Sequence, residues 1–102
     1  MSEQIVNSDV DNDLSLEEIY EEAELEESDL NDQVSNVVIE LCAARSCSGS
    51  FHSVHEGLGV ITEEYFEFVE AVRSNDINKI RDEATQLSAM ALNILIDFKS
   101  EE

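Results

Sequence analysis

Acidic side chains at helical spacing are the residues of this chain best suited to chemistry. Glu64 and Glu67 stand three residues apart, Glu63 adjoins them, and Glu70 continues the spacing. At about 100° per residue, these carboxylates fall within an arc of about 120° on one helix. The opposite side of the same helix is apolar and carries Ile61, Tyr65, Phe68, Val69 and Val72. The pattern therefore predicts a helix with one acidic face and one apolar face.

A second set of side chains repeats at intervals of three and four residues further along the chain. It consists of Glu83, Gln86, Met90, Asn93 and Asp97. The short polar turn 73–76 separates the two patterns, and so short a connection favours antiparallel packing of the two helices. Carboxylate and amide oxygens are ligands for hard cations such as Mg²⁺. The sequence thus predicts two polar faces that meet around a cation.

Spacing alone also fits other interpretations of these residues. The chain has 25 acidic residues, and carboxylates three apart are typical of a solvated helix face as well. Met90 suits packing in a core as well as packing against a nucleobase. His52 and His55 have the spacing of a transition-metal site with Glu56. However, His52 precedes the predicted helix start, and Glu56 fits a capping role.

The charge of the chain narrows the classes of partner. Its formal net charge is −20, and Met1 to Gln33 contains 13 acidic residues and no Lys or Arg. We expect no direct binding of nucleic acid, because neutralising phosphates requires clustered basic residues. A basic protein partner, by contrast, would match the acidic N-terminal region.

Targeting and redox signals point to an ordinary intracellular protein. No run of about eighteen apolar residues occurs, and the N-terminus is acidic where a signal peptide is basic and then apolar. The sequence therefore predicts a cytoplasmic protein with no membrane contact. Cys42 and Cys47 match the spacing of neither a zinc ribbon nor a redox pair, so we expect both to be reduced.

The composition favours long helices over a sheet. Proline is absent, and the three glycines lie within eleven residues of one another, so few turns interrupt the chain. We predict an all-α fold with an acidic N-terminal segment, 1–28, and a helical domain, 29–102. The segment is expected to begin as a disordered tail, 1–13, and to continue as a short helix. A capping box at Ser15–Glu18 starts that helix, which we expect to end near Glu27.

We predict that the domain is a helical bundle of three main helices. The first is capped by Ser28 or Asp29 and ends near Arg45. Phe51 then closes the end of the core. The apolar stripe of this helix is Leu30, Val34, Val37, Val38 and Leu41.

The second main helix begins at a capping box, Ser53–Glu56, and runs to about Arg73. It includes Gly57 and Gly59, each of which costs on the order of 1 kcal/mol relative to alanine. Either a close backbone approach or a frayed first turn would explain them.

The last helix is predicted over 77–98. Asn75 or Asp76 caps its start. Its expected core stripe is Ile80, Ala84, Leu87, Ala91, Ile94 and Phe98.

Two stretches of this sequence also resemble a known family. HEGLGVITEEYFE, from His55 to Glu67, and DEATQLSAMAL, from Asp82 to Leu92, are similar to the MazG-like branch of the all-α nucleotide pyrophosphohydrolases. The similarity covers roughly 34–97. In that superfamily the first metal-binding helix carries Glu-x-x-Glu, the next carries Glu-x-x-Asp, and an asparagine often follows seven residues later.

The family motifs transfer to this chain with one departure. Glu64 and Glu67 match the first motif, Glu83 matches the start of the second, and Asn93 matches the later asparagine. Gln86 stands where the superfamily has its metal-binding aspartate. An amide oxygen can ligate Mg²⁺ but brings no charge, which favours weaker metal binding or one ion in place of two.

The resemblance implies a reaction and roles for these residues. It implies hydrolysis of a nucleoside triphosphate to the monophosphate and pyrophosphate, with Mg²⁺ or Mn²⁺ as the cofactor. The implied metal ligands are Glu64, Glu67, Glu83 and Gln86. Glu63 is the best candidate for orienting the attacking water, and the candidate substrate-binding residues are Asn93, Lys79 and Arg81.

The resemblance also implies a homo-oligomer, a dimer or a tetramer, whose subunits complete a four-helix core together. An alternative of a different class is a catalytically weak or inactive MazG-like protein. Such a protein would bind or mask a basic, nucleic-acid-binding surface of a partner. The basic-free stretch 1–33 and Gln86 favour this alternative.

Overall fold

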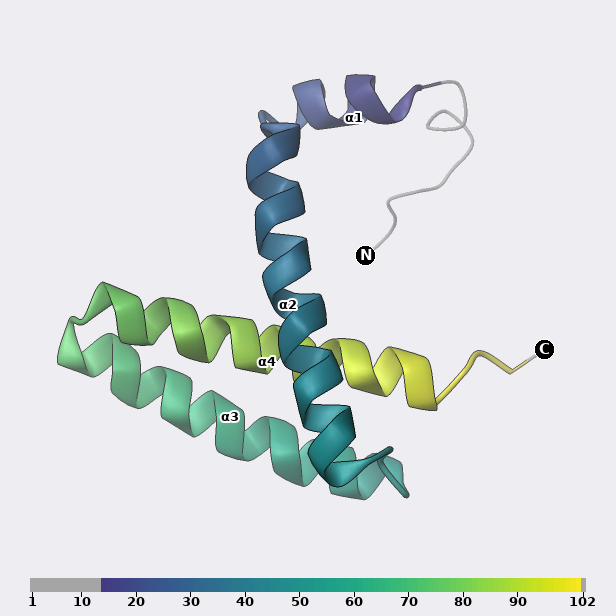
Figure 1. Cartoon of the computed structure of the whole chain (residues 1–102), viewed down its shortest axis with the longest axis vertical. Helices are drawn as coiled ribbons and strands as arrows, with labels where there is room; N and C mark the ends of the chain where they lie inside the picture. The colour runs from purple at the N-terminus through teal and green to yellow at the C-terminus, as the bar shows by residue number, and fades with distance from the viewer. Residues whose placement is uncertain (1–13, 102) are drawn as a thin grey trace. The chain divides into compact units, whose positions relative to one another are not determined.

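The computed structural model describes residues 14–101 and is all-helical over that range, which confirms the predicted all-α class. Its helices are α1 (Leu16–Glu22), α2 (Glu27–Ser48), α3 (Val54–Ser74) and α4 (Ile77–Asp97) (Figure 1). Residues 14–101 contain no strand. The tail predicted for residues 1–13 lies outside the described part of the chain. The chain divides into two compact units between Asp32 and Gln33, inside α2.

The first unit contains α1, whose capping box forms as predicted. The Ser15 hydroxyl accepts a hydrogen bond from the Glu18 amide at 3.1 Å, and the Glu18 carboxylate accepts one from the Ser15 amide at 2.8 Å. These bonds from Ser15 lower the pKa of Glu18. The helix ends at Glu22, earlier than predicted, and Glu24 adopts a left-handed conformation with φ of 59°.

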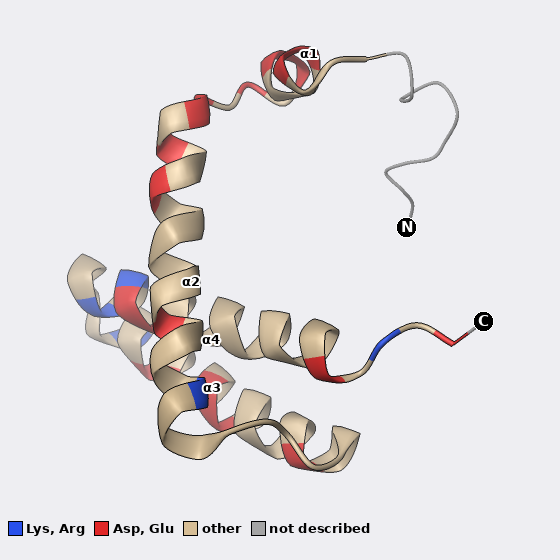
Figure 2. Ribbon diagram, turned by 45° about the vertical axis from the view of Figure 1, so that its right-hand side comes forward, with Lys and Arg blue, Asp and Glu red and all other residues tan. Residues whose placement is uncertain are grey.

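Acidic residues dominate the described part of this unit, which carries no Lys or Arg (Figure 2). Three aliphatic side chains, Leu16, Ile19 and Leu25, are exposed among them. The prediction that Ser28 or Asp29 caps the next helix is wrong, because α2 already begins at Glu27 and includes both residues. Helix α2 also extends past Arg45 to Ser48.

Helices α3 and α4 form an antiparallel hairpin joined by Asn75 and Asp76. Asn75 ends α3 in a left-handed conformation with φ of 60°, a conformation that asparagine tolerates well. Asp76 caps α4, and its carboxylate accepts hydrogen bonds from the amides of Asn78 and Lys79. The sequence predicted either Asn75 or Asp76 as the cap of α4, and the structure shows that it is Asp76.

The second capping box forms only in part. The Ser53 hydroxyl accepts a hydrogen bond from the Glu56 amide at 3.0 Å. The Glu56 carboxylate accepts one from the His52 amide at 2.5 Å. Because the carboxylate reaches the residue before the cap, both side chains still satisfy amide donors at the start of α3.

The core of the second unit is small. Leu41 of α2 packs with Ala89 and Met90 of α4, and Phe51 lies against this cluster as predicted. The buried residues of α4 are Ala89, Met90 and Asn93. The six-residue core stripe predicted for α4 is wrong, because its members are half-buried or, at Ala91, exposed.

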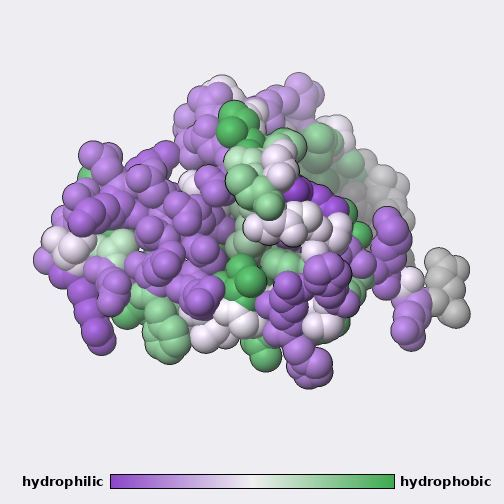
Figure 3. Space-filling view, turned by 60° about the horizontal axis from the view of Figure 1, so that its bottom comes forward, coloured by the Kyte–Doolittle hydropathy of each residue, from purple (hydrophilic) through white to green (hydrophobic). Residues whose placement is uncertain are grey.

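The physical reason is the side of α4 on which α2 packs. Leu41 of α2 packs with Ala89 and Met90, and at about 100° per residue these positions lie on a different side of α4 from the predicted stripe. The stripe predicted for α2 is also only partly buried. Leu41 is buried, whereas Val34 and Val38 are exposed. Other hydrophobic side chains reach the surface as well (Figure 3).

Arg45 ties the end of α2 to the end of α4. Its guanidinium donates hydrogen bonds to Asn93, to Asp97 at 3.0 Å and to Ser50 at 3.0 Å. The Asp97 carboxylate also accepts a hydrogen bond from the Phe51 amide at 2.8 Å. The Phe51 amide, followed by Arg45, lowers the pKa of Asp97. Asn93 is only 2% exposed, so this network lies against the core.

The two glycines of α3 differ in their surroundings. A Cβ atom at Gly57 would lie 3.1 Å from the Ile94 side chain and 3.2 Å from Phe51. A Cβ atom at Gly59 would meet nothing within 4 Å. Close approach therefore explains Gly57 and does not explain Gly59.

This contrast gives a matched pair of variants. We expect Gly59→Ala to raise the free energy of unfolding by about 1 kcal/mol, because alanine is the better helix former. Gly57→Ala has the same helical gain but crowds Ile94 and Phe51, and overpacking of this kind costs about 1–3 kcal/mol. Gly57→Ala should thus be less stable than Gly59→Ala by about 1 kcal/mol or more in urea denaturation followed by circular dichroism. Equal stabilisation by both would contradict the close packing at Gly57.

Candidate metal centre

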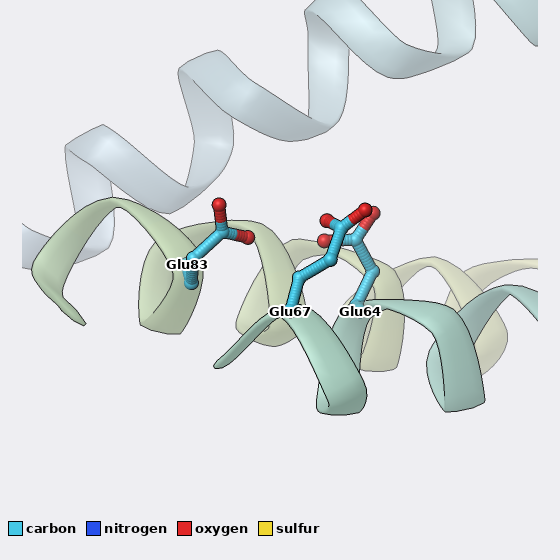
Figure 4. A group of neighbouring side chains, drawn as sticks. All are labelled: Glu64, Glu67 and Glu83. Atoms are coloured by element: carbon cyan, nitrogen blue, oxygen red, sulfur yellow. The ribbon is translucent and has the colours of Figure 1, made fainter. Parts of the chain in front are cut away.

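Three carboxylates converge on one side of the α3–α4 hairpin. Glu64 and Glu67 come from α3 and Glu83 comes from α4, and one oxygen of each lies within 4.8 Å of the others. Their side chains project to the same side, toward the ribbon of α2 (Figure 4). Within residues 14–101, this is the group of three or more acidic, His or Cys side chains close enough to hold one ion.

Local structure explains the convergence. Residues three apart on a helix are neighbours on its surface, so Glu64 and Glu67 point the same way from α3. The connection of Asn75 and Asp76 folds α4 back along α3, which brings Glu83 beside them. The sequence prediction that the two acidic faces meet is confirmed for these three residues.

Two oxygens of the group are buried without a partner. Glu64 Oε1 and Glu83 Oε1 are inaccessible to solvent and make no hydrogen bond. Burying a carboxylate oxygen without a compensating bond is unfavourable. An oxygen-ligated cation would supply the missing interaction, so the donor set and its unsatisfied atoms fit Mg²⁺.

The same arrangement perturbs the acidity of the group. Burial, followed by the charges of Glu67 and Glu83, raises the pKa of Glu64. Burial, followed by the charge of Glu67, raises the pKa of Glu83. In the absence of a cation, the fold therefore holds negative charges together against their mutual repulsion.

Glu40 of α2 is an acidic neighbour that the sequence prediction missed. It is half-buried, and its charge contributes to the raised pKa of both Glu64 and Glu83. Only a weak signal for it was present in the sequence. Glu40 follows Val37 by three residues and precedes Leu41, which places a carboxylate beside apolar side chains but does not show which helix it faces.

A hollow of about 280 Å³ adjoins two of the three carboxylates, Glu67 and Glu83, toward the α3–α4 turn. Lys79 lines it together with Glu67 and Glu83. The remaining lining residues are Glu70, Ala71 and Ser74. Of the two predicted basic substrate contacts, Lys79 is thus the one that shares a hollow with the acidic group.

A second hollow, of about 390 Å³, lies between α2 and α4. It is lined by Asn36, Glu40, Arg81, Asp82, Thr85 and Gln86. Gln86, the predicted fourth ligand, is one helical turn from Glu83 and half-buried there. The Arg81 guanidinium donates a hydrogen bond to Gln33 at 3.1 Å, so the structure places Arg81 away from Lys79.

The remaining candidates lie outside the acidic group. Glu63 adjoins Glu64 in sequence but is exposed. Asn93 is buried and accepts a hydrogen bond from Arg45, and Met90 belongs to the core. Asp97 is held by Arg45 and Phe51, as described above.

Within the described residues, neither the histidines nor the cysteines belong to a group of side chains that could hold a metal ion. His52 is exposed, and its Nδ1 lies 3.5 Å from Glu56 Oε1. His55 joins no ligand group in the described residues. Cys42 and Cys47 are both free and exposed. None of the helices in the described range is long and apolar enough to cross a membrane.

Comparison with known proteins adds no identification. No protein-family model, no curated protein and no solved structure matches the chain.

The buried, unpartnered carboxylates predict a trade-off between stability and cation binding. Without divalent cations, Glu64→Gln should raise the melting temperature at pH 7, because it removes one of the repelling charges. A change of about 1 kcal/mol moves the melting temperature by about 4–8 °C in a domain of this size. Millimolar Mg²⁺ should stabilise the wild type but not this variant. A cation at ten times its dissociation constant adds about 1.4 kcal/mol.

The pH dependence follows from the direction of the pKa changes. A carboxyl group whose folded-state pKa is raised destabilises the fold once it ionises. The difference between wild type and Glu64→Gln should therefore be absent below the ordinary value of 4.5 and grow as pH rises through the raised pKa. Glu63→Gln removes the same charge from an exposed neighbour and serves as the control. An equal effect of both variants, with and without Mg²⁺, would contradict the site.

Proposed function

We propose that this protein is a Mg²⁺-dependent nucleoside triphosphate pyrophosphohydrolase of the MazG-like kind. The observation that carries the proposal is the convergence of Glu64, Glu67 and Glu83, with two of their oxygens buried and unpartnered. These are the same three positions that match the family's metal-binding motifs. Mn²⁺ is an alternative cation for the same donors.

The proposed roles divide the site between cation and substrate. Glu64, Glu67 and Glu83 supply charged oxygens for the cation, and Gln86 contributes a neutral one from the next turn of α4. When bound, Mg²⁺ offsets the charge of the phosphates and lowers the pKa of a water molecule. Basic residues are too scarce to do this alone, since the chain has only five Lys and Arg.

The protein's own residues would orient the reactants. Lys79 lines the hollow beside Glu67 and Glu83, so its ammonium group is suited to the triphosphate. Glu63, exposed at the edge of the acidic group, is proposed to orient the water that attacks the α-phosphorus. The bond between that phosphorus and the oxygen bridging to the β-phosphate breaks, and pyrophosphate leaves.

The positions of Arg81 and Asn93 refine their proposed roles in substrate binding. Arg81 lines the hollow between α2 and α4 with Gln86, so it would contact a part of the nucleotide away from Lys79. Asn93 would require release of its bond from Arg45 before it could bind substrate. We also include a homo-oligomer, a dimer or a tetramer, in the proposal. Self-association would complete a four-helix core.

An assay for pyrophosphate tests the proposal. Purified full-length protein is incubated with Mg²⁺ or Mn²⁺ and a panel of ribo- and deoxyribonucleoside triphosphates. We expect pyrophosphate and the monophosphate in equal amounts. The double variant Glu64→Ala with Glu67→Ala should lose about 100-fold or more of the rate, since losing even a supporting partner of a ligand costs 10–100-fold.

Two controls make the assay specific. Glu21→Gln removes an acid from α1, outside the acidic group, and should leave the rate unchanged. Lys79→Ala should raise KM more than it lowers kcat if Lys79 binds the triphosphate. Absence of pyrophosphate with every nucleotide, or an unchanged rate in the double variant, would refute the enzymatic proposal.

A second candidate function is an acidic interaction protein of MazG-like fold with weak or no catalysis. The observation that favours it is α1, where exposed Leu16 and Ile19 stand among four glutamates in a basic-free segment. Aliphatic side chains flanked by carboxylates match a partner surface that is basic at its rim and apolar at its centre. Such a partner would be a nucleic-acid-binding protein whose basic surface is masked.

Removal of the N-terminal segment tests this second candidate. Full-length protein and a form lacking residues 1–29 are compared in pull-downs at low and moderate salt. We expect a basic partner to be retained by the full-length protein and lost from the shortened form. Leu16→Ser with Ile19→Ser should reduce retention without changing the charge. If a partner is retained equally by all forms, the N-terminal segment does not bind it, and this second candidate is refuted.

A further inference from the structure

Helix α2 brings a fourth carboxylate to the side of the hairpin where the acidic group lies. The part of α2 from Gln33 to Ser48 belongs to the same compact unit as the hairpin, and the three carboxylates of the hairpin project toward it (Figure 4). Glu40 is the acidic residue of that part, and it is half-buried. The next residue, Leu41, packs in the core with Ala89 and Met90. Packing therefore holds Glu40 at the boundary between α2 and the hairpin.

Glu40 shares a hollow with Gln86, the predicted ligand that carries no charge. The hollow of about 390 Å³ between α2 and α4 is lined by both side chains. At about 100° per residue, Gln86 falls about 60° from Glu83 and about 60° from Ala89 around α4. Ala89 is fully buried and packs with Leu41 of α2, so Gln86 lies between the carboxylates and the contact with α2. Glu40 thus brings a carboxylate to the place where the family that the sequence resembles carries an aspartate.

The charge of Glu40 is not neutralised by a basic side chain. None of the ion pairs in the described part of the chain involves Glu40. Arg81 lines the same hollow, but its guanidinium donates a hydrogen bond to Gln33. Burial is the first cause of the raised pKa of Glu64 and of Glu83, and the charge of Glu40 adds to both. Without a cation, α2 and the hairpin therefore repel each other at this boundary.

The apolar contact that opposes this repulsion is small. Helix α2 contributes the buried Leu41 and the partly buried Val37 and Ala44 to the core cluster, whereas Val34 and Val38 are exposed. A cation between α2 and the hairpin would replace repulsion by attraction, because the carboxylates on both sides would then face a positive charge. It would also supply a partner for the buried oxygens of the acidic group, which make no hydrogen bond.

We propose that Glu40 supplies the fourth negative charge of the cation site, in place of the charge missing at Gln86, and that the bound cation holds α2 against the hairpin. Glu40 is outside the group whose oxygens lie within 4.8 Å of one another. Two ligands of one Mg²⁺ lie at most about 4.2 Å apart, since each Mg–O bond is about 2.1 Å long. Glu40 therefore accepts hydrogen bonds from water bound to the cation, because Mg²⁺ keeps several of its waters. This role depends on the cation site proposed above and not on nucleotide hydrolysis.

Binding of Mn²⁺ to the full-length protein, followed by the electron paramagnetic resonance signal of the free ion, provides the first test. Glu40→Gln should weaken binding about 10–100-fold, the usual cost of losing a partner that acts through a ligand. Adding Gln86→Asp to Glu40→Gln should restore the affinity to the wild-type range, because the charge returns to the site. Asp82→Asn is the matched control. Asp82 lines the same hollow but is exposed, so its loss should weaken binding much less.

Hydrogen exchange of backbone amides tests whether the cation holds α2. Saturating Mg²⁺ should slow exchange in the wild type, relative to EDTA, both in the hairpin and in residues 37–44 of α2. Glu40→Gln should keep the protection of the hairpin and lose that of residues 37–44. In EDTA, Glu40→Gln should have a higher melting temperature than the wild type, because it removes a repelling charge. A residue that only supported the fold would give the opposite shift.

The outcomes separate this role of Glu40 from the cation site itself. If the wild type binds Mn²⁺ and Glu40→Gln binds it equally well, the cation site stands and the role of Glu40 is overturned. Equal weakening by Asp82→Asn, failure of Gln86→Asp to restore binding, or a lower melting temperature of Glu40→Gln in EDTA would also overturn it. If the wild type binds no Mn²⁺, both the role of Glu40 and the proposed cation site are wrong.

Discussion

Repulsion among three carboxylates on one hairpin is the interaction on which the rest of this structure depends. Glu64, Glu67 and Glu83 lie together because α4 folds back along α3, and nothing in the described residues neutralises them. Hydrophobic burial must offset this repulsion, yet the core contains few fully buried residues. The cation that we propose would relieve this repulsion, and for that reason it would matter more here than in a domain with a large core.

The sequence predicted those parts of the fold that depend on local chemistry. The capping box of α1, half of the one at α3, and a cap for α4 at one of two adjacent residues all follow from hydrogen bonding within a few residues, and the structure shows each of them. The buried face of α4 was not predictable in this way. It depends on the side of α4 against which α2 packs, and that side carries Ala89 and Met90, not the stripe that the period of α4 singles out.

In the candidate site, too, residues placed by local spacing were predicted, and residues placed by packing between helices were not. Spacing within each helix identified Glu64, Glu67 and Glu83, and the antiparallel turn brought them together. Glu40 was missed because it comes from a helix that crosses the hairpin, and periodicity within one helix contains no information about such a crossing. Asn93 was assigned because it follows Gln86 by seven residues, as in the family motif, whereas its burial beside Arg45 depends on the end of α2.

The two-residue connection between α3 and α4 has a consequence for how the chain folds. The contacts next to this connection join residues that are close in sequence, and closing so short a loop costs little entropy. All three carboxylates belong to this hairpin, so their repulsion opposes the pairing of α3 with α4 whether or not α2 is in place. An interaction formed in the transition state changes the folding rate, whereas one formed later changes the unfolding rate. If the hairpin pairs before α2 packs on it, a cation at the proposed site would accelerate folding.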